Sequence, residues 1–371
     1  MKLLTSSMRY LMLCTAIGVA APLKAQDLNV NLFTHLEFDN SDAADAADRT
    51  VEWGESALFV TGNLTGKLSF LGEFTYVAPK YTDKSFSAHR YRIRYEFNRD
   101  NAVSFGKMHT PVNYWNDNFH HGRIFFPTIN RPRSFSRFIP IHEVGVRFSG
   151  MSPMVDGVGY DIVLGTGQSE GDDAFGSGVQ SYTVNFNWAP SPDSRAIVSY
   201  YRDTILDHAD NPFHAGHNHG VGDHMGMDHM DMGHDGMHMG MPMEAADSGT
   251  DEDIPYELLS FSFHHENEYW RTLTEISTNR TDGGDWNWAV YQYAGYHISE
   301  EFSVYALYDY ITVDDSETHF RPGSERRVGL GLEWFVTNTT SFKLEARSED
   351  TDQSPIRIDD NVLEAQLSFA F

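Results

Sequence analysis

Apolar and polar residues alternate along most of the chain after residue 26. Near the start, Leu28, Val30 and Leu32 alternate with Asn29 and Asn31, and the pattern returns in the C-terminal segment. A period of two is the period of a β-strand whose two faces meet different environments. The pattern therefore predicts an all-β chain of about sixteen strands and restricts the fold to a sandwich or a barrel.

The connections between the expected strands alternate between short and long. The short set comprises residues 63–66, 98–101, 150–156, 189–194, 266–268, 299–301 and 337–340. The long set comprises residues 40–50, 79–85, 108–140, 166–178, 206–253, 279–285, 314–325 and 348–359. A soluble sandwich gives no reason for this alternation, whereas it is typical of a transmembrane antiparallel β-barrel with short periplasmic turns and long extracellular loops. We therefore expect such a barrel.

The composition agrees with a barrel in lipid. The mean hydropathy is −0.44, yet 13% of the residues are aromatic. After the first 25 residues, no apolar run approaches the roughly 20 residues that a spanning helix requires. A polar chain keeps its backbone hydrogen-bonded in lipid only if its strands close into a barrel.

The N-terminus predicts export. Lys2 and Arg9 precede an apolar run at residues 10–21, and Ala25 is a small residue at which cleavage can occur. We therefore expect a signal peptide at residues 1–25, followed by a barrel at residues 26–371. Cys14, the single cysteine, lies in the expected signal peptide. Without the three basic residues of that peptide, the chain carries 24 basic and 53 acidic side chains, a net charge of −29, which argues against nucleic acid as a partner.

Two stretches carry a family resemblance. The ending Leu367-Ser368-Phe369-Ala370-Phe371 resembles the C-terminal signal of Gram-negative outer-membrane barrels. A longer motif resembles a group of porin-like proteins of Gram-negative bacteria, most without an assigned substrate, and distantly the phosphate-selective porins O and P. It comprises Gly106-Lys107-Met108-His109-Thr110-Pro111, Tyr114-Trp115-Asn116, Phe119-His120-His121-Gly122, Arg131-Pro132 and Ile139-Pro140-Ile141-His142-Glu143.

The resemblance implies a cellular location and binding partners for the chain. It implies the outer membrane of a Gram-negative bacterium, with membrane lipid and the barrel assembly machinery as partners, and it leaves a homotrimer open. It also implies that the third outer connection, residues 108–140, folds into the barrel as a constriction. The chain departs from the phosphate-selective porins, which line their channels with Arg and Lys, because it has far more acidic than basic residues.

The connection at residues 206–253 is rich in potential metal ligands. Residues 207–243 hold eight His and eight Met, and no Lys or Arg occurs between residues 203 and 270. Thioethers suit Cu(I) or Ag(I), imidazoles suit Cu(II), Zn(II) or Ni(II), and carboxylates tolerate either class. We expect copper or a related ion to bind here, the alternative being a polar loop without a ligand. The candidate ligands are His208, His214, His217, His219, His224, Met225, Met227, Asp228, His229, Met230, Asp231, Met232, His234, Met237, His238, Met239, Met241 and Met243.

A second set of candidates belongs to the expected pore. If Tyr91, Ile93 and Tyr95 face lipid, the arginines between them face inward, where they either select anions or neutralise inward acids such as Glu73 and Glu96. The histidines near the constriction either coordinate a cation or pin the inward segment to the wall. The candidates are Arg90, Arg92, Arg94, His109, His120, His121, Arg123, Arg131, Arg133, His142 and Glu143.

No nucleophile elbow or pair of catalytic carboxylates stands out, so we do not expect an enzyme. The sequence favours a porin-like channel for small hydrophilic solutes, with an extracellular loop that binds copper or another transition metal. Two alternatives remain open: a non-conducting barrel that captures metal, and an anion-selective porin with an incidental loop.

Overall fold

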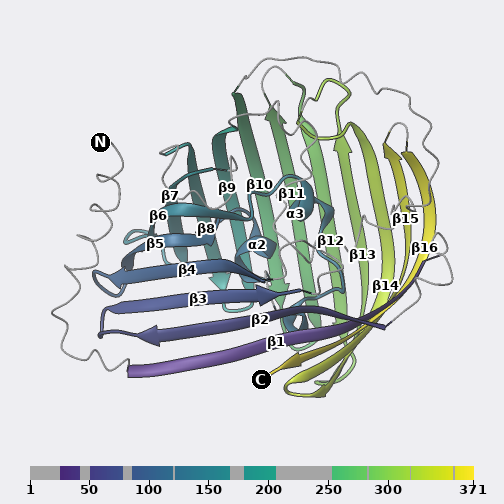
Figure 1. Cartoon of the computed structure of the whole chain (residues 1–371), viewed down its shortest axis with the longest axis horizontal. Helices are drawn as coiled ribbons and strands as arrows, with labels where there is room; N and C mark the ends of the chain where they lie inside the picture. Colours follow the sequence, from purple (N-terminus) through teal and green to yellow (C-terminus); the bar gives the residue numbers. More distant parts are fainter. Residues whose placement is uncertain are drawn as a thin grey trace, which may run out of the picture.

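A computed structural model describes residues 26–41, 51–77, 86–119, 122–167, 179–205, 253–281, 284–317, 319–353 and 356–371. Sixteen strands form one closed antiparallel barrel, in which each strand pairs with its neighbours in the chain and β1 pairs with β16 (Figure 1). Closure removes the unpaired edges that an open sheet would leave in lipid. The predicted fold class and strand number are confirmed.

The strands are β1 (Gln26–Ser41), β2 (Val51–Asn63), β3 (Leu68–Tyr76), β4 (Phe86–Glu96), β5 (Asn101–His109), β6 (His142–Met151), β7 (Val158–Gly165), β8 (Ser181–Ser191), β9 (Ser194–Ile205), β10 (Ile254–Glu266), β11 (Trp270–Thr281), β12 (Asn287–His297), β13 (Phe302–Val313), β14 (Gly323–Thr337), β15 (Thr340–Gln353) and β16 (Ile356–Ala370). Three short helices interrupt the connection between β5 and β6. They are α2 (Tyr114–Asn118), η1 (Arg123–Phe125) and α3 (Arg133–Arg137). None of the helices in the described ranges is long and apolar enough to cross a membrane.

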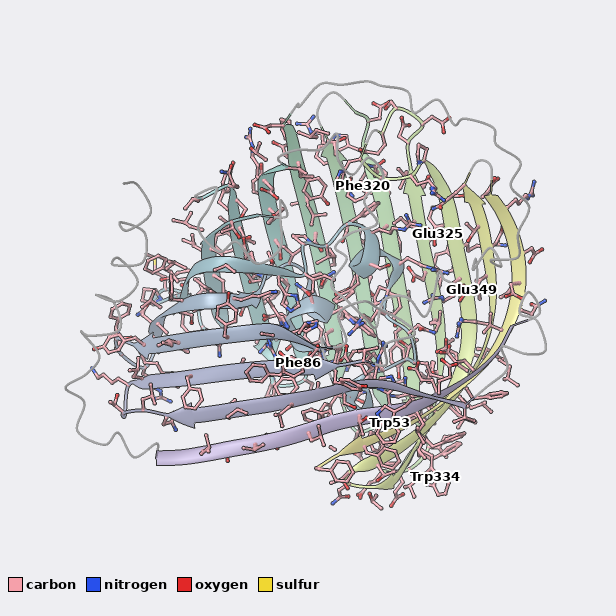
Figure 2. All side chains as sticks on the ribbon, in the orientation of Figure 1. Trp53, Phe86, Phe320, Glu325, Trp334 and Glu349 are labelled. Carbon is pink, nitrogen blue, oxygen red and sulfur yellow. The ribbon has the colours of Figure 1, made fainter. Side chains whose placement is uncertain are left out.

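The outer surface of the barrel is apolar and faces lipid. On β4, Tyr91, Ile93 and Tyr95 are exposed on this surface, and most other strands contribute exposed Val, Leu, Ile or Phe in the same way. Exposed aromatic residues lie near both ends of the strands, including Trp53 and Trp334 (Figure 2). A lipid-facing apolar band between two aromatic girdles is typical of a transmembrane barrel.

The two rims differ as the sequence predicts. One, the short-turn rim, carries the connections at residues 64–67, 97–100, 152–157, 192–193, 267–269, 298–301 and 338–339. The other, the long-loop rim, carries the long connections. One predicted long loop, at residues 348–359, is wrong, because β15 and β16 continue through it as far as the pair Gln353 and Ile356.

The error at residues 348–359 has an electrostatic cause. The acidic residues of this stretch suggest a solvated loop, but both faces of the extended hairpin neutralise them. On the outer face, Arg326 pairs with Asp350 at 3.1 Å. On the inner face, Arg327 pairs with Glu349 at 3.0 Å. The acids therefore belong to paired strands.

Candidate constriction and pore lining

Residues 110–119 and 122–141, which we call the inward segment, leave the wall and pack inside the barrel (Figure 1). Gly106, the first residue of the porin-like motif, lies in β5 just before this segment. Gly106 has φ +130°, and a Cβ atom there would lie 2.0 Å from the carbonyl oxygen of Tyr91. Only glycine fits this close approach between β4 and β5, which gives the motif's first residue a structural role.

We therefore expect Gly106→Ala to lower the free energy of unfolding by about 1–3 kcal/mol, the range for a strained backbone position. Gly66→Ala is the matched control, because a Cβ atom at Gly66 meets nothing within 4 Å. Urea unfolding of both variants in detergent, followed by tryptophan fluorescence, measures the difference. Equal stability of the two variants would show that the close approach at Gly106 does not constrain the backbone.

Asn116 holds the two ends of the inward segment together. Its Nδ2 donates to the carbonyl oxygens of Thr110 at 2.8 Å and Ile141 at 3.2 Å. Asn113, at φ 53°, caps α2 by accepting a hydrogen bond from the backbone N–H of Asn116 at 3.0 Å. This explains why the motif carries an asparagine after Tyr114-Trp115.

The first turn of α2 is seated on the inner wall. The backbone N–H of Tyr114 donates to Ser262 of β10 at 3.0 Å, and that of Trp115 donates to Glu275 of β11 at 2.8 Å. The Tyr114 ring stacks on His264 with 4.4 Å between the ring centroids. Burial raises the pKa of the Tyr114 hydroxyl, because desolvation disfavours the phenolate. Tyr114 is therefore a neutral hydrogen-bonding group at the constriction.

An apolar core fixes the inward segment against one side of the barrel. Its members from the segment include Trp115, Phe126, Phe135 and Ile141, and its members from the wall are Leu273, Tyr291, Tyr293, Tyr305 and Leu307. A second cluster joins Val112, Phe138 and Ile139 to inward residues such as Tyr201, Tyr256 and Phe320. Because these clusters lie on β9 to β13 and the connection after β13, the segment occupies that side of the lumen.

Ion pairs extend this anchor to β14 and β15. Arg133 pairs with Glu325 at 3.3 Å and with Glu349 at 2.6 Å, and Arg137 pairs with Glu325 at 2.7 Å. Glu325 and Glu349 lie on the neighbouring strands β14 and β15 (Figure 2). Arg327 also donates to the carbonyl oxygen of Arg131 at 3.2 Å. The segment is thus held by charge as well as by apolar packing.

A cavity of about 250 Å³ remains between the inward segment and the opposite wall. It is lined by Asn31, Phe33, Phe59, Thr61, Arg90, His109, Asp117, Asn118 and Phe125. These residues come from β1, β2, β4, β5, α2 and η1. The cavity therefore lies on the side of the barrel that the apolar anchor leaves free.

A second cavity of about 280 Å³ lies toward the short-turn rim. Its charged lining residues are Arg94, Glu96, Arg99, Asp100, Arg147 and Asp161. Arg90 lines the first cavity and Arg94 lines the second, so Arg92 stands between them on β4, about 7 Å from each along the strand.

The predicted arginine ladder faces inward, but most of it is paired. Arg90 forms an ion pair with Glu73, and Arg94 lies 3.5 Å from Glu96. Arg147 of β6 pairs with Asp161 at 2.8 Å and with Asp117 of α2 at 3.3 Å. Both interpretations of the ladder thus have support, because neutralisation by Glu73 and Glu96 occurs alongside a basic lining.

Arg92 is the exception in this ladder. Among the residues that the structure describes, it forms no ion pair with a carboxylate. The charges that act on it most are those of Arg147, Arg90 and Arg94, opposed by Asp117. Arg92 therefore places a positive charge on β4 between the residues that line the two cavities.

The other pore candidates lie away from the open lumen. Arg123 and Arg133 are buried between the inward segment and the wall. Arg131 lies over the rings of Phe126 and Phe135, at 5.5 and 5.1 Å from the centroids. Glu143 accepts hydrogen bonds from Ser181 at 2.5 Å and Thr183 at 3.4 Å. The contacts of Glu143 therefore join two wall strands, β6 and β8, and do not hold the inward segment.

Three buried histidines lie together near the long-loop rim. The centroid of the His142 ring lies 5.2 Å from that of His109 and 5.3 Å from that of His89. His89 was not among the residues predicted from the sequence to line the pore. Within the described ranges, no group of three or more His, Cys, Asp or Glu residues is arranged to hold a metal ion. His120, His121, the predicted signal peptide at residues 1–25 and every candidate ligand between His208 and Met243 lie outside the described residues.

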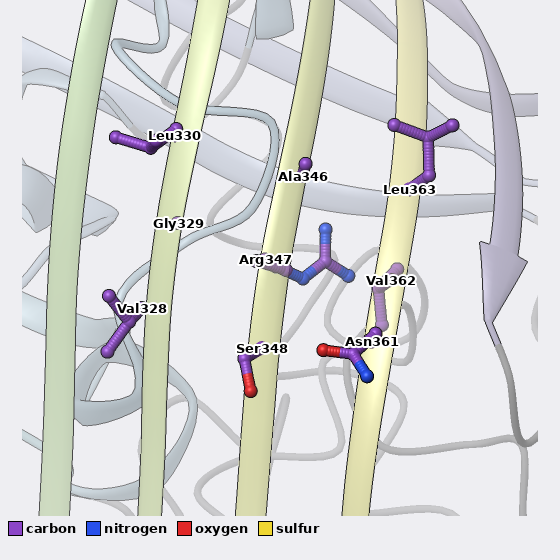
Figure 3. Close-up of a pocket in the computed structure, with 9 residues that line it drawn as sticks. All are labelled: Val328, Gly329, Leu330, Ala346, Arg347, Ser348, Asn361, Val362 and Leu363. Atoms are coloured by element: carbon purple, nitrogen blue, oxygen red, sulfur yellow. The ribbon is translucent and has the colours of Figure 1, made fainter.

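A third hollow, of about 510 Å³, is not part of the lumen. It lies on the outer face of β14 to β16, between Val328 and Leu330 on one side and Leu363 on the other, with Ala346 and Ser348 on the middle strand (Figure 3). Val328, Leu330 and Leu363 are all exposed on the lipid side. The hollow therefore meets membrane lipid and cannot guide a solute through the barrel.

Neither the models of known protein families nor the sequences of curated proteins match this chain. Solved structures match it over almost its whole length. The outer membrane channel DcaP of Acinetobacter baumannii is 9% identical with a TM-score of 0.60, covering 93% of this chain and 97% of DcaP. An anion-selective porin from Comamonas acidovorans is 11% identical with a TM-score of 0.59, covering 93% and 100%. A trimer form of OmpT, an outer membrane protein of Vibrio cholerae, is 11% identical with a TM-score of 0.59, covering 94% and 100%. The chain has the fold of the porin-like outer-membrane β-barrels.

Proposed function

We propose that the protein is a channel of the Gram-negative outer membrane that admits small hydrophilic solutes. One observation carries this proposal: the inward segment is anchored to one side of the lumen and leaves cavities of about 250 and 280 Å³ on the other, both with charged side chains in their lining. Cavities of this size with charged groups in the lining suit small hydrated solutes. The long-loop rim would face outward, as in other barrels of this kind.

Uptake of neutral sugars into vesicles that contain the full chain tests this function. We expect vesicles with the protein to swell in small sugars and to swell progressively more slowly as the sugar grows. Vesicles that swell no faster than protein-free vesicles would contradict a diffusion channel and would favour a barrel that only captures metal.

A preference for anionic solutes is the second candidate. It is favoured by Arg92, whose charge is unpaired among the described residues and is reinforced by Arg90, Arg94 and Arg147. The anion-selective porin of Comamonas acidovorans shares the fold, which agrees with this candidate. The trimer form of Vibrio cholerae OmpT likewise agrees with a homotrimer.

The connection between β9 and β10 adds a metal-binding function to this proposal. Its eight His and eight Met residues between residues 207 and 243 supply imidazole and thioether ligands without a competing Lys or Arg. Because β9 ends and β10 begins at the long-loop rim, the connection would capture copper, or zinc, nickel or silver, outside the cell.

Replacing residues 207–243 by a Gly/Ser segment of equal length is expected to abolish copper binding while conductance is retained. The reason is that the substituted segment removes the concentrated ligands and leaves β9 and β10 unchanged. Titration of both proteins with copper and zinc, together with conductance recordings, checks the result. Equal metal binding by both proteins would show that the segment does not bind the metal.

A further inference from the structure

A row of polar and aromatic side chains crosses the outer surface of the barrel at the long-loop rim. Arg202 of β9 is directly opposite Glu257 of β10, which is directly opposite Arg280 of β11. Tyr182 of β8 is opposite Arg202 at one end of the row. Trp286, just before β12, lies under the guanidinium of Arg280 at 4.8 Å from the ring centroid. We call these five residues the rim row.

The rim row is open to its surroundings. About half of each arginine side chain is exposed, 48% for Arg202 and 46% for Arg280, whereas Glu257 is 21% exposed. Tyr182 and Trp286 are also exposed. The guanidinium groups therefore extend beyond the carboxylate that lies between them.

One carboxylate serves both arginines. Arg280 donates to Oε2 of Glu257 at 2.9 Å, and Arg202 lies 3.7 Å from Oε1. The three groups together carry a net charge of +1, on a chain whose formal charge is −26. A guanidinium has five N–H donors, so both arginines keep donors that Glu257 does not use.

The surface beside the rim row, toward the middle of the membrane, is apolar. Val198, Leu259, Ile276 and Trp288 are exposed there, on the four strands β9 to β12. The row thus lies at the boundary between a lipid-facing surface and the long-loop rim. Guanidinium groups above an apolar wall match a molecule with an anionic head and hydrocarbon chains, and phosphate is an anion that arginine can bind with two parallel hydrogen bonds.

We propose that the rim row binds the phosphate group of a glycolipid in the membrane leaflet at the long-loop rim. Arg202 and Arg280 donate to the phosphate oxygens, Tyr182 and Trp286 flank the head group, and the acyl chains lie along the apolar surface of β9 to β12. Glu257 holds the two guanidinium groups on either side of one carboxylate and weakens binding by its own charge.

Variants of the rim row separate this site from a closed network of ion pairs. In a closed network, Glu257 attracts both arginines and the row binds no outside ligand, so the loss of the Glu257 charge does not increase lipid binding. In a phosphate site, Glu257→Gln removes the one negative charge and strengthens binding. The double variant Arg202→Gln/Arg280→Gln removes the donors. Arg326→Gln is the matched control, because Arg326 is also exposed on the outer face, is also paired with a carboxylate, and lies on β14 away from the row.

The test uses the full chain folded into phosphatidylcholine vesicles with an equal small fraction of either bis-phosphorylated lipid A or its dephosphorylated form. Native mass spectrometry after gentle extraction measures the bound lipid, and conductance confirms that each variant is folded. We expect retention of the phosphorylated form only, a loss of roughly fivefold per arginine in the double variant, and a gain of similar size for Glu257→Gln.

Arg326→Gln should retain as much lipid as the wild type. Equal retention of the phosphorylated and dephosphorylated lipids would overturn the proposal, as would a loss with Arg326→Gln equal to that of the double variant. Lower retention by Glu257→Gln would support a closed ion-pair network instead. Displacement of the lipid by the same concentration of inorganic phosphate would show that the row binds free anions and not a lipid.

Discussion

Replacing Arg327 by Ala should lower the free energy of unfolding by about 3–5 kcal/mol, because it breaks a buried ion-pair network. The Arg327 side chain is 3% exposed and lies 3.0 Å from Glu349 and 3.9 Å from Asp309, which is fully buried. It also donates to the carbonyl oxygen of Arg131 in the inward segment at 3.2 Å. The substitution leaves two carboxylates with less compensation and loosens the segment.

Arg326→Ala is the control for this prediction, since it removes the same side chain from the preceding residue of β14. Arg326 is 54% exposed and pairs with Asp350, which is 41% exposed. An exposed pair contributes about 0–1 kcal/mol. Urea unfolding of both variants in lipid vesicles, followed by tryptophan fluorescence, gives the comparison. If the two variants lose equal stability, the inner network does not hold the inward segment.

Replacing Arg92 by Glu should shift the ratio of anion to cation permeability toward cations by about tenfold, because it changes the charge by two units beside the cavities. The shift should shrink as salt rises, since the Debye length falls from about 10 Å at 0.1 M to about 3 Å at 1 M. Reversal potentials in a salt gradient measure the ratio.

Arg326→Glu makes the same change of charge on the outer face and should leave the ratio almost unchanged. An unaltered ratio in Arg92→Glu would mean that solutes do not pass between β4 and the inward segment. A shift of the same size in both variants would assign selectivity to the overall charge of the protein.

The barrel was predictable because its strands carry a strong period of two. Tyr91, Ile93 and Tyr95 mark the lipid side of β4, and this alone places Arg90, Arg92 and Arg94 in the lumen. The alternation of short and long connections predicted that one rim carries the short turns and the other the long loops. The acidic stretch at residues 348–359 was wrongly expected to be a loop, because its neutralising arginines lie on neighbouring strands that the local sequence does not identify.

The apolar interior was not predicted. Barrel interiors are usually polar, yet Tyr291 and Tyr293 on β12 and Leu307 on β13 face inward and are buried by the inward segment. A signal was present in the sequence, since Trp288 and Val290 on β12 alternate with Ala289 and Tyr291, so that both faces of the strand are apolar. Such a strand indicates that something packs on its inner face, but not which segment does so.

Only the structure shows which side of the lumen stays open. The sequence grouped Arg123, Arg131 and Arg133 with the pore arginines. All three bond to side chains of β14 or β15, wall strands that lie more than a hundred residues further along the chain. The sequence does not distinguish Arg92 from Arg90 and Arg94. The structure does, because it shows the acidic partners of Arg90, Arg94 and Arg147.

Conductance of the full chain in a planar lipid bilayer tests the central claim most directly. The cavities beside the anchored inward segment predict stepwise, long-lived openings, and the Arg92 charge predicts a preference for anions at low salt. Absence of any conductance from a folded, inserted barrel would contradict the channel.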